Sequence, residues 1–415
     1  MNKILLFTLL FLVPSFAGAA TKKKSSKPAV DPETVFEKGK EAFYNYDFEE
    51  AEEQFEEYQR LQEKKKKPLD PEFEDLERQL GIASNAFDRV EKIVVIDSIS
   101  VPADDFYKYY KISKSSGKLQ KGRGGAVNLD LPENEFSFSN DSDDYFIWSE
   151  PGSEGFRSLK EGIRLISSDW IIEDIRFSEQ EEGINYIFPF MSPDGQTLYF
   201  ASDGPGSMGG YDLFVAQRDP ISGEFKQPLN MGMPFNSPYD DLLMAVDEEN
   251  GIGWWATDRD SGEGKITVYV YLLNDIRRNY PSDTENLVSL ARLDDFKMTQ
   301  TGQDGQPLEN IPSVPQIAYG QKATAGDFYL NMGGGKIYRS LKDFKNKKAA
   351  QQMSLYLKKE NELESEQRKL RDLRMRYKSN DKGLMSEIGQ LEKKVEQLRL
   401  EAKALKSEVY RLERS

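Results

Sequence analysis

The 415-residue chain contains neither cysteine nor histidine. Without cysteine it has no disulfides and no lipid-modified N-terminal cysteine, so its fold depends on its apolar core. Without histidine it has no Ser-His-Asp or Cys-His nucleophile, no His-ligated zinc or iron, and no imidazole base at neutral pH. These two absences remove several common catalytic and metal-binding chemistries.

Long apolar runs are missing too, except at the start of the chain. A positive charge in Met1–Lys3, an apolar run in Ile4–Val13 and small residues up to position 20 are typical of a secretory signal peptide over residues 1–20. A membrane anchor is the alternative, but a run of about 10 to 14 apolar residues is too short to span a bilayer. We expect an exported chain with no transmembrane span after cleavage, and a basic, disordered linker over residues 21–30.

The formal charge of −15 is unevenly distributed. Residues 346–415 contain 18 Lys and Arg against 12 Asp and Glu, a net charge of +6, which leaves −21 on the remainder. An acidic body disfavours general nucleic-acid binding, because neutralising phosphates requires a basic face. We therefore expect no nucleic-acid partner and a well-solvated surface outside the cytoplasm.

The stretch from Phe188 to Val215 predicts two strands joined by a tight turn, followed by a third strand. Pro193 presets φ in the turn, Asp194 and Gly195 tolerate the reversal, and the flanking residues are apolar and aromatic. The pattern Tyr199–Asp203 recurs as Trp254–Asp258, and more loosely as Tyr145–Ser149, at a spacing of about 54 residues. A four-stranded propeller blade needs about that length.

This stretch resembles the TolB-type β-propeller repeat of exported Gram-negative envelope proteins. The matching positions are Ser192, Pro193, Asp194, Gly195, Leu198, Phe200, Ser202, Asp203, Gly204, Gly210, Tyr211, Asp212 and Phe214. The second copy contributes Trp255 and Asp258, and Asn230–Asp241 resembles the N-x-G-x-P-x-N-[ST]-x-x-D-D extension of such repeats. The resemblance implies four-stranded antiparallel blades within residues 94–345, with these motif residues in structural roles.

Closure of the predicted propeller is left open. A closed propeller normally needs at least four blades. The fourth would lie in Gln316–Phe344, as a hairpin across Gly333–Gly335.

Residues 31–93 predict helical hairpins. This segment resembles a tetratricopeptide repeat. The residues at the spacings of that repeat are Gly39, Phe43, Asp47, Phe48, Ala51 and Phe55. A further helix in Pro71–Ile93 gathers its apolar residues on one face. The resemblance implies a concave peptide-binding face, whereas the alternative is packing against the rest of the chain.

The last segment, residues 346–415, carries a heptad repeat. The predicted seam is Leu384, Ile388, Leu391, Val395, Leu398, Ala402, Leu405, Val409 and Leu412. Branched residues with Leu favour a parallel two-stranded coil, which would give a homodimer. Polar residues upstream, at Gln367, Arg374 and Asp381, and turn-forming residues in 377–383 favour an antiparallel hairpin within one chain. We favour the hairpin.

Several polar and aromatic groups have a functional and a structural interpretation. An Asp/Glu glycosidase pair would be chosen from Asp194, Asp203, Asp212, Asp240, Asp241 and Asp258, but turn positions favour Asp for its backbone hydrogen bonds. The loops Asn140–Asp144 and Asp247–Gly251 are oxygen-rich but lack the full calcium-binding pattern. Two roles, stacking on a sugar or packing in the core, are possible for the four tryptophans Trp148, Trp170, Trp254 and Trp255. We predict no catalytic, cofactor-binding or metal residue.

The sequence thus predicts a multidomain α+β chain with N-terminal helical hairpins, propeller-like blades and long C-terminal helices. We expect a non-enzymatic scaffold for envelope proteins in the periplasm or at the outer-membrane periphery. The alternatives are a carbohydrate-active propeller and a module that binds glycan or peptidoglycan. Chains of related architecture often end in an OmpA-like peptidoglycan-binding domain, in whose place this chain has helices.

Overall fold

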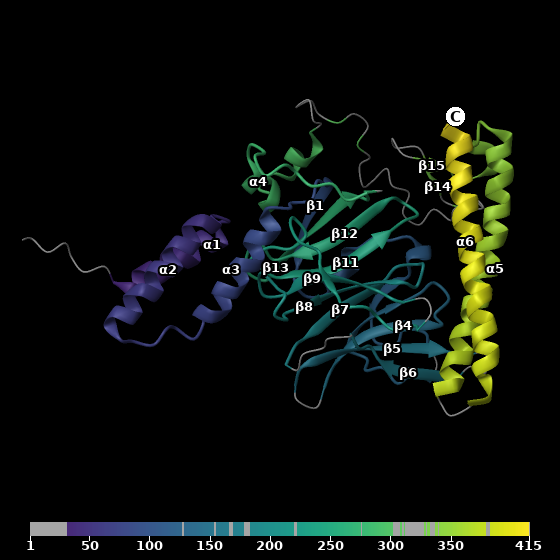
Figure 1. The fold of residues 1–415 in the computed structure, drawn as a ribbon, viewed down its shortest axis with the longest axis horizontal. Coiled ribbons are helices and arrows are strands. Elements are labelled where there is room, and N and C mark those ends of the chain that lie inside the picture. The colour runs from purple at the N-terminus through teal and green to yellow at the C-terminus, as the bar shows by residue number, and fades with distance from the viewer. Residues whose placement is uncertain are drawn as a thin grey trace, which may run out of the picture.

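The computed structural model describes residues 31–126, 128–152, 155–165, 169–177, 183–219, 222–274, 276–301, 308, 311, 328, 330–332, 337–338, 340–378 and 382–414. Figure 1 shows helices at both ends of this chain and antiparallel sheets between them, which confirms the expected α+β class. The predicted signal peptide and linker lie outside the described residues. Across those that are described, no helix is long and apolar enough to span a membrane.

The N-terminal helices are α1 (Pro32–Tyr44), α2 (Phe48–Lys65) and α3 (Phe73–Phe87). Asp47 caps α2 by accepting a hydrogen bond from the backbone N–H of Glu50 at 3.3 Å. Gly39 lies where α1 crosses α2, and a Cβ atom there would come within 2.5 Å of the Phe55 ring. The close crossing therefore requires glycine, and the aromatic side chains of α1 and α2 fill the space between the helices.

Helix α3 joins the helical region to the sheets. Arg78 donates a hydrogen bond to the carbonyl oxygen of Pro205 at 2.7 Å, and Gln79 donates one to that of Gly209 at 2.7 Å. The apolar cluster of the helices also includes Met208 and Met233 from sheet loops, together with two residues of α4 (Leu287–Arg292). The N-terminal helices therefore share a core with the sheet region.

The central region contains three antiparallel sheets. The first has the order β2-β3-β4-β5-β6 and the second β10-β9-β8-β7. The third has the order β1-β13-β12-β11, so the first strand of the region pairs with the last. The strands are β1 (Val94–Pro102), β2 (Lys118–Lys121), β3 (Phe136–Ser139), β4 (Tyr145–Pro151), β5 (Arg157–Arg164), β6 (Trp170–Asp174), β7 (Tyr186–Met191), β8 (Thr197–Ser202), β9 (Asp212–Gln217), β10 (Leu229–Asn230), β11 (Asp241–Asp247), β12 (Ile252–Thr257) and β13 (Lys265–Leu272).

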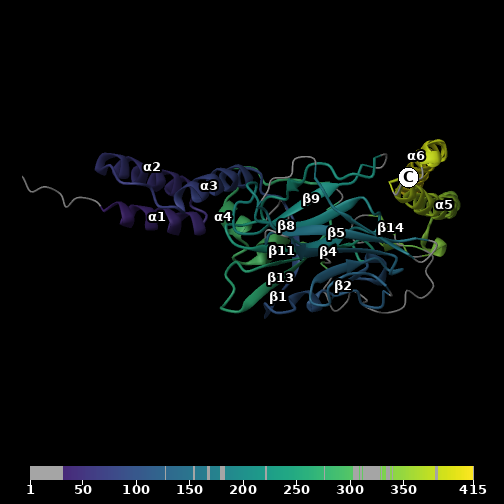
Figure 2. The same cartoon turned by 90° about the horizontal axis from the view of Figure 1, so that it is seen from below.

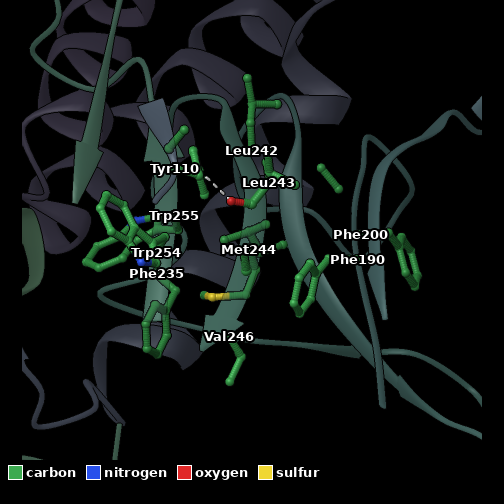
Figure 3. Packing of buried hydrophobic residues seen from close by; sticks show 14 of the residues in the cluster. Tyr110, Phe190, Phe200, Phe235, Leu242, Leu243, Met244, Val246, Trp254 and Trp255 are labelled. Atoms are coloured by element: carbon green, nitrogen blue, oxygen red, sulfur yellow. Dashed lines mark hydrogen bonds between the residues drawn. The ribbon is translucent and has the colours of Figure 1, made fainter. Parts of the chain in front are cut away.

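One apolar core connects the three sheets. Figure 3 shows its part around Trp254 and Trp255, which occupy successive positions of β12 and therefore point to opposite faces of the sheet. Both indoles are fully buried, because Tyr110 covers one face and Phe235 the other. The Tyr110 hydroxyl donates to the carbonyl oxygen of Leu243 at 2.7 Å. Burial on both faces explains why β12 lacks a polar–apolar alternation.

In the described part of the chain, the three sheets form no closed propeller. The strands nearest to the predicted fourth blade are β14 (Leu330–Asn331) and β15 (Ile337–Tyr338), each two residues long. Their apolar neighbours pack with Met353 and Val409 of the C-terminal helices rather than with the sheet core. The turn predicted at Gly333–Gly335 lies outside the described residues.

The long C-terminal helices, α5 (Lys347–Lys378) and α6 (Met385–Arg414), fold back on each other. Ion pairs between them run in antiparallel order, from Lys359–Glu401 at 3.0 Å to Arg374–Glu392 at 2.7 Å. Of the two arrangements that the sequence left open, the structure has the hairpin within one chain. Figure 2 shows the hairpin nearly end-on, on the opposite side of the sheets from α1 and α2.

Packing against α5 covers much of the predicted coiled-coil seam. Val395, Leu398, Ala402 and Val409 of α6 are buried within the single chain. The remaining short elements are 3-10 helices at Phe106–Tyr109, Lys114–Ser116, Phe296–Gln300, Leu341–Asp343 and Lys382–Leu384.

Candidate functional site

The Ser192–Gly195 turn joins β7 to β8. Asp194 Oδ1 accepts hydrogen bonds from the Ser192 hydroxyl at 2.5 Å and from the Gln196 N–H at 2.8 Å. Gly195 has a φ of +66°, in the left-handed region that favours glycine. Pro193, Asp194 and Gly195 therefore perform the turn roles that their residue types indicate.

The two clear copies of the repeat use an aspartate in the same way. Asp203 accepts hydrogen bonds from the backbone N–H of Asn185 at 2.7 Å and from its side-chain amide at 2.6 Å. In the next copy, Asp258 accepts from the backbone N–H of Asp240 at 2.9 Å. Each carboxylate thus fixes the entry into a strand 18 residues earlier in the chain.

Asp212 orders the loop that precedes β9. Its carboxylate accepts from the N–H groups of Met208 at 3.0 Å and Gly209 at 3.2 Å, and from the Asn230 side chain at 2.6 Å. Burial, with a further contribution from Asp241, raises the pKa of Asp212 well above its ordinary value. The other motif residues of this loop, Ser202, Gly204, Gly210 and Tyr211, lie beside the same hydrogen-bond network.

A buried ion pair joins the first residue of β11 to the loop that follows β12, and Arg259 of this loop also donates to the carbonyl oxygen of Ala291 in α4 at 3.4 Å. Arg259 donates to Asp241 at 2.6 Å, and both side chains are at most 1% exposed. Arg259 also donates to the carbonyl oxygen of Phe235 at 2.8 Å, while Ser237 donates to Asp241 at 2.7 Å. Burial raises the pKa of Asp241 to about 6, against the opposing effect of Arg259.

These contacts engage the carboxylates from which a glycosidase pair would be drawn. Asp240 likewise accepts from the backbone N–H of Tyr211 at 2.8 Å. Five of the six candidates hold backbone amides, and Asp241 holds the Arg259 guanidinium. Their arrangement braces loops and strand ends.

The two oxygen-rich loops use their carboxylates in a similar manner. Asp143 accepts from the Ser139 hydroxyl at 3.0 Å and pairs with Lys118 at 2.5 Å. Asp247 accepts from the N–H and the hydroxyl of Ser113, both at 2.8 Å. In the described ranges, no three acidic side chains gather in a way that could hold a metal ion.

The tryptophans are placed for packing rather than for stacking on a sugar. Trp148, Trp254 and Trp255 are fully buried. Trp170 is half-buried and contacts Phe146 edge-on, with ring centroids 5.6 Å apart.

A cleft lies between the sheets and the C-terminal hairpin, with a volume of about 460 Å³. The Ser192–Gly195 turn and the end of β9 form its body wall, and α5 and α6 form its hairpin wall. Seam residue Val395 lies in the hairpin wall. The strongest motif in the sequence and the heptad segment therefore meet at this cleft.

The two walls of the cleft differ in charge. The body wall supplies the six acidic residues Asp141, Asp144, Glu161, Glu173, Asp194 and Asp219, and the single base Arg218. The hairpin wall supplies three bases, Arg368, Arg374 and Arg399. Arg218 pairs with Glu161 at 2.5 Å and donates to the Tyr145 hydroxyl at 3.1 Å. Burial lowers the pKa of Arg218, but Glu161 outweighs that effect and keeps the pKa above its ordinary value.

The hairpin arginines are held by glutamates of α6. Arg374 donates to Glu392 at 2.7 Å, and Arg399 donates to Glu396 at 3.1 Å. Burial lowers the pKa of Arg374 despite Glu392. The Nε–H groups of Arg218 and Arg399 are buried and have no hydrogen-bond acceptor in the described structure.

The sequence did not predict the cleft arginines as a group, although one signal pointed to them. Gln367 and Arg374 interrupt the heptad pattern of α5 at positions where an apolar residue is expected. Both line the cleft. Polar residues in a seam therefore marked the part of the hairpin that faces a cavity.

Comparison with models of protein families, and with curated proteins, gives no match for this chain. The TolB-type and tetratricopeptide resemblances therefore rest on the sequence motifs, and the structure shows N-terminal helices and antiparallel sheets that are compatible with them.

Proposed function

We propose that this protein is a non-enzymatic scaffold that mediates protein–protein interactions in the cell envelope. In this proposal residues 1–20 direct export, and the N-terminal helices are tetratricopeptide-like. The three sheets are TolB-type blades of an open propeller-like body. The C-terminal hairpin is an arm for partner chains.

One observation carries the proposal. The motif carboxylates are engaged with backbone amides or with Arg259, whereas the hairpin extends along one side of the body and exposes large apolar side chains. Leu355, Met385 and Leu400 are at least half exposed on this hairpin. A partner chain that lies along the arm would bury these side chains and gain the free energy of apolar burial.

Photo-cross-linking from the arm tests this function. A photoreactive amino acid replaces Leu400 in the full chain, in intact cells, and cross-linked proteins are identified by mass spectrometry. We expect envelope proteins above background. The matched control replaces Leu398, which is 5% exposed, and it should give none of these products. Absence of any envelope protein at position 400 would count against the scaffold.

A second cavity favours glycan binding as the runner-up function. It measures about 490 Å³ and lies between the sheets and α6. Its lining combines aromatic rings with hydrogen-bonding groups, in Tyr199, Phe235, Tyr271, Tyr410, Glu91, Asn274 and Glu248. Aromatic faces bind sugar rings, and carboxylates and amides bind hydroxyls. Sedimentation with insoluble peptidoglycan, compared between the unmodified chain and Tyr199→Ala, tests this alternative.

A further inference from the structure

We propose that the cleft between the sheets and the C-terminal hairpin binds the last three or four residues of a partner protein, with the terminal carboxylate on the hairpin arginines and a basic side chain on the acidic body wall. This inference rests on the proposed scaffold role and names the chemistry that the scaffold recognises.

The charges of the cleft select the class of ligand. Six acidic residues and four arginines line it, so its net charge is negative. A polyanion such as nucleic acid or polyphosphate would be repelled. A ligand with charges of both signs, separated by a few ångströms, satisfies both walls, and a C-terminal peptide with one Lys or Arg has that form.

The hairpin arginines indicate where the anionic end lies. Arg374 and Arg399 line the cleft, and one glutamate of α6 accepts a hydrogen bond from each, at 2.7 and 3.1 Å. An arginine has five N–H donors, so a carboxylate in the cleft can accept further charge-assisted hydrogen bonds from these two groups. Arg374, whose pKa burial lowers, would also gain from a second anion beside it.

The size and floor of the cleft fit a short peptide. A volume of about 460 Å³ lies within the usual range of ligand sites, about 300–1,000 Å³. Phe138, Ile163, Met191, Leu370 and Val395 give the cleft an apolar part that can receive one apolar side chain. The occupant is therefore a segment of a few residues rather than a folded surface.

Binding of immobilised peptides to the full chain tests the inference. The probes are pentapeptides attached through a blocked N-terminus, with varied last three residues, each prepared with a free carboxylate and as a C-terminal amide. We expect binding only of peptides with a free carboxylate, strongest with a Lys or Arg among the varied residues. Arg399→Gln should weaken binding at least tenfold.

Matched variants control for a general loss of charge and for unfolding of the hairpin. Arg411→Gln removes an exposed arginine of α6 that pairs with Glu408 and does not line the cleft, and it should leave binding unchanged. Arg399→Lys keeps the positive charge, and circular dichroism of each variant measures whether the hairpin is still folded. Equal binding of amides and acids, or an unaltered affinity in Arg399→Gln, would overturn the assignment.

The two proposals can fail separately. If the unmodified chain binds none of the peptides while the cross-links from position 400 persist, the cleft assignment falls and the scaffold remains. Peptide binding at the cleft without any envelope partner in cells would remove the scaffold.

Discussion

At the scale of single residues, buried aspartates determine how the repeats are built. Asp212 and Asp241 are fully buried, and a buried charge is costly unless hydrogen bonds or an opposite charge compensate it. Asp212 meets this requirement with three N–H donors, and Asp241 meets it with Arg259. The buried aspartates of the motif are therefore tolerated because N–H donors or Arg259 compensate their charge.

Removing Arg259 should strongly destabilise the folded chain. Arg259→Met leaves Asp241 buried without its partner, and we expect the free energy of unfolding to fall by about 3–5 kcal/mol. Urea unfolding followed by tryptophan fluorescence measures this change. Adding Asp241→Leu should restore part of the loss, because the uncompensated charge is gone. Arg411→Met, which breaks an exposed pair, should leave the urea midpoint almost unchanged.

The pKa of Asp241 predicts a pH dependence. Its folded-state pKa of about 6 lies above the ordinary value of 3.8, so the folded chain binds this proton more tightly than the unfolded chain. The contribution to stability is therefore fully present below about pH 4 and is lost as the pH rises through 6. We expect the urea midpoint to fall between pH 4.5 and 6.5 by less in Asp241→Asn than in the unmodified chain. Equal slopes would contradict the raised pKa.

At the scale of elements, the hairpin shows how the same heptad can serve two arrangements. Apolar residues at seam positions require a partner helix but do not specify which one. Here α5 is the partner, since the ion pairs between α5 and α6 run in antiparallel order. The seam of α6 is consequently covered over Val395–Val409 without a second chain.

Two neighbouring leucines test which face of α6 packs. Leu398 is 5% exposed and Leu400 is 60% exposed. Leu398→Ala should lower the local stability of the hairpin by about 2–4 kcal/mol, whereas Leu400→Ala should change it by less than about 0.5 kcal/mol. Hydrogen exchange of α6 amides, resolved by mass spectrometry, measures both. Comparable losses in the two variants would place α6 in another orientation.

Local signals predicted the elements, but not their long-range partners. Pro193 and Gly195 located a turn, Gly39 a helix crossing, and the leucine repeat a pair of helices, because each acts within a few residues of itself. Nothing in Val94–Pro102 indicates that it pairs with Lys265–Leu272, and nothing around Arg218 or Arg399 indicates a shared cavity. Such contacts follow from how the sheets and the hairpin pack, which no single segment encodes.

At the scale of the whole molecule, the uneven charge has a structural counterpart. The segment with a net charge of +6 forms the hairpin, and it faces an acidic wall of a body that carries the remaining −21. The N-terminal helices instead join the body through the apolar side chains of Met208, Met233 and Leu287. The two junctions should respond differently to salt, since only exposed charges are screened.

Salt should therefore loosen the hairpin but not the N-terminal helices. Because the chain has no native cysteine, Leu229→Cys with Leu400→Cys places two fluorophores, one on the body and one on the hairpin. We expect the transfer efficiency to fall as NaCl rises from 50 mM to 1 M. The matched pair Leu229→Cys with Asn85→Cys, on α3, should keep a constant efficiency. A hairpin signal as insensitive as that of α3 would contradict electrostatic docking.

The position of β1 has a consequence for how the molecule is made. Val94–Pro102 leaves the ribosome early, but its pairing strand, Lys265–Leu272, is synthesised only after all the other strands of the three sheets. Until β13 has been synthesised, the backbone edge of β1 has no pairing strand, and Val95 and Val101 lack the burial that they have in the folded chain. Folding of the body is thus completed by a contact between its first and last strands. A chain that ends before β13 therefore keeps β1 as an unpaired strand, whose exposed edge is prone to aggregation.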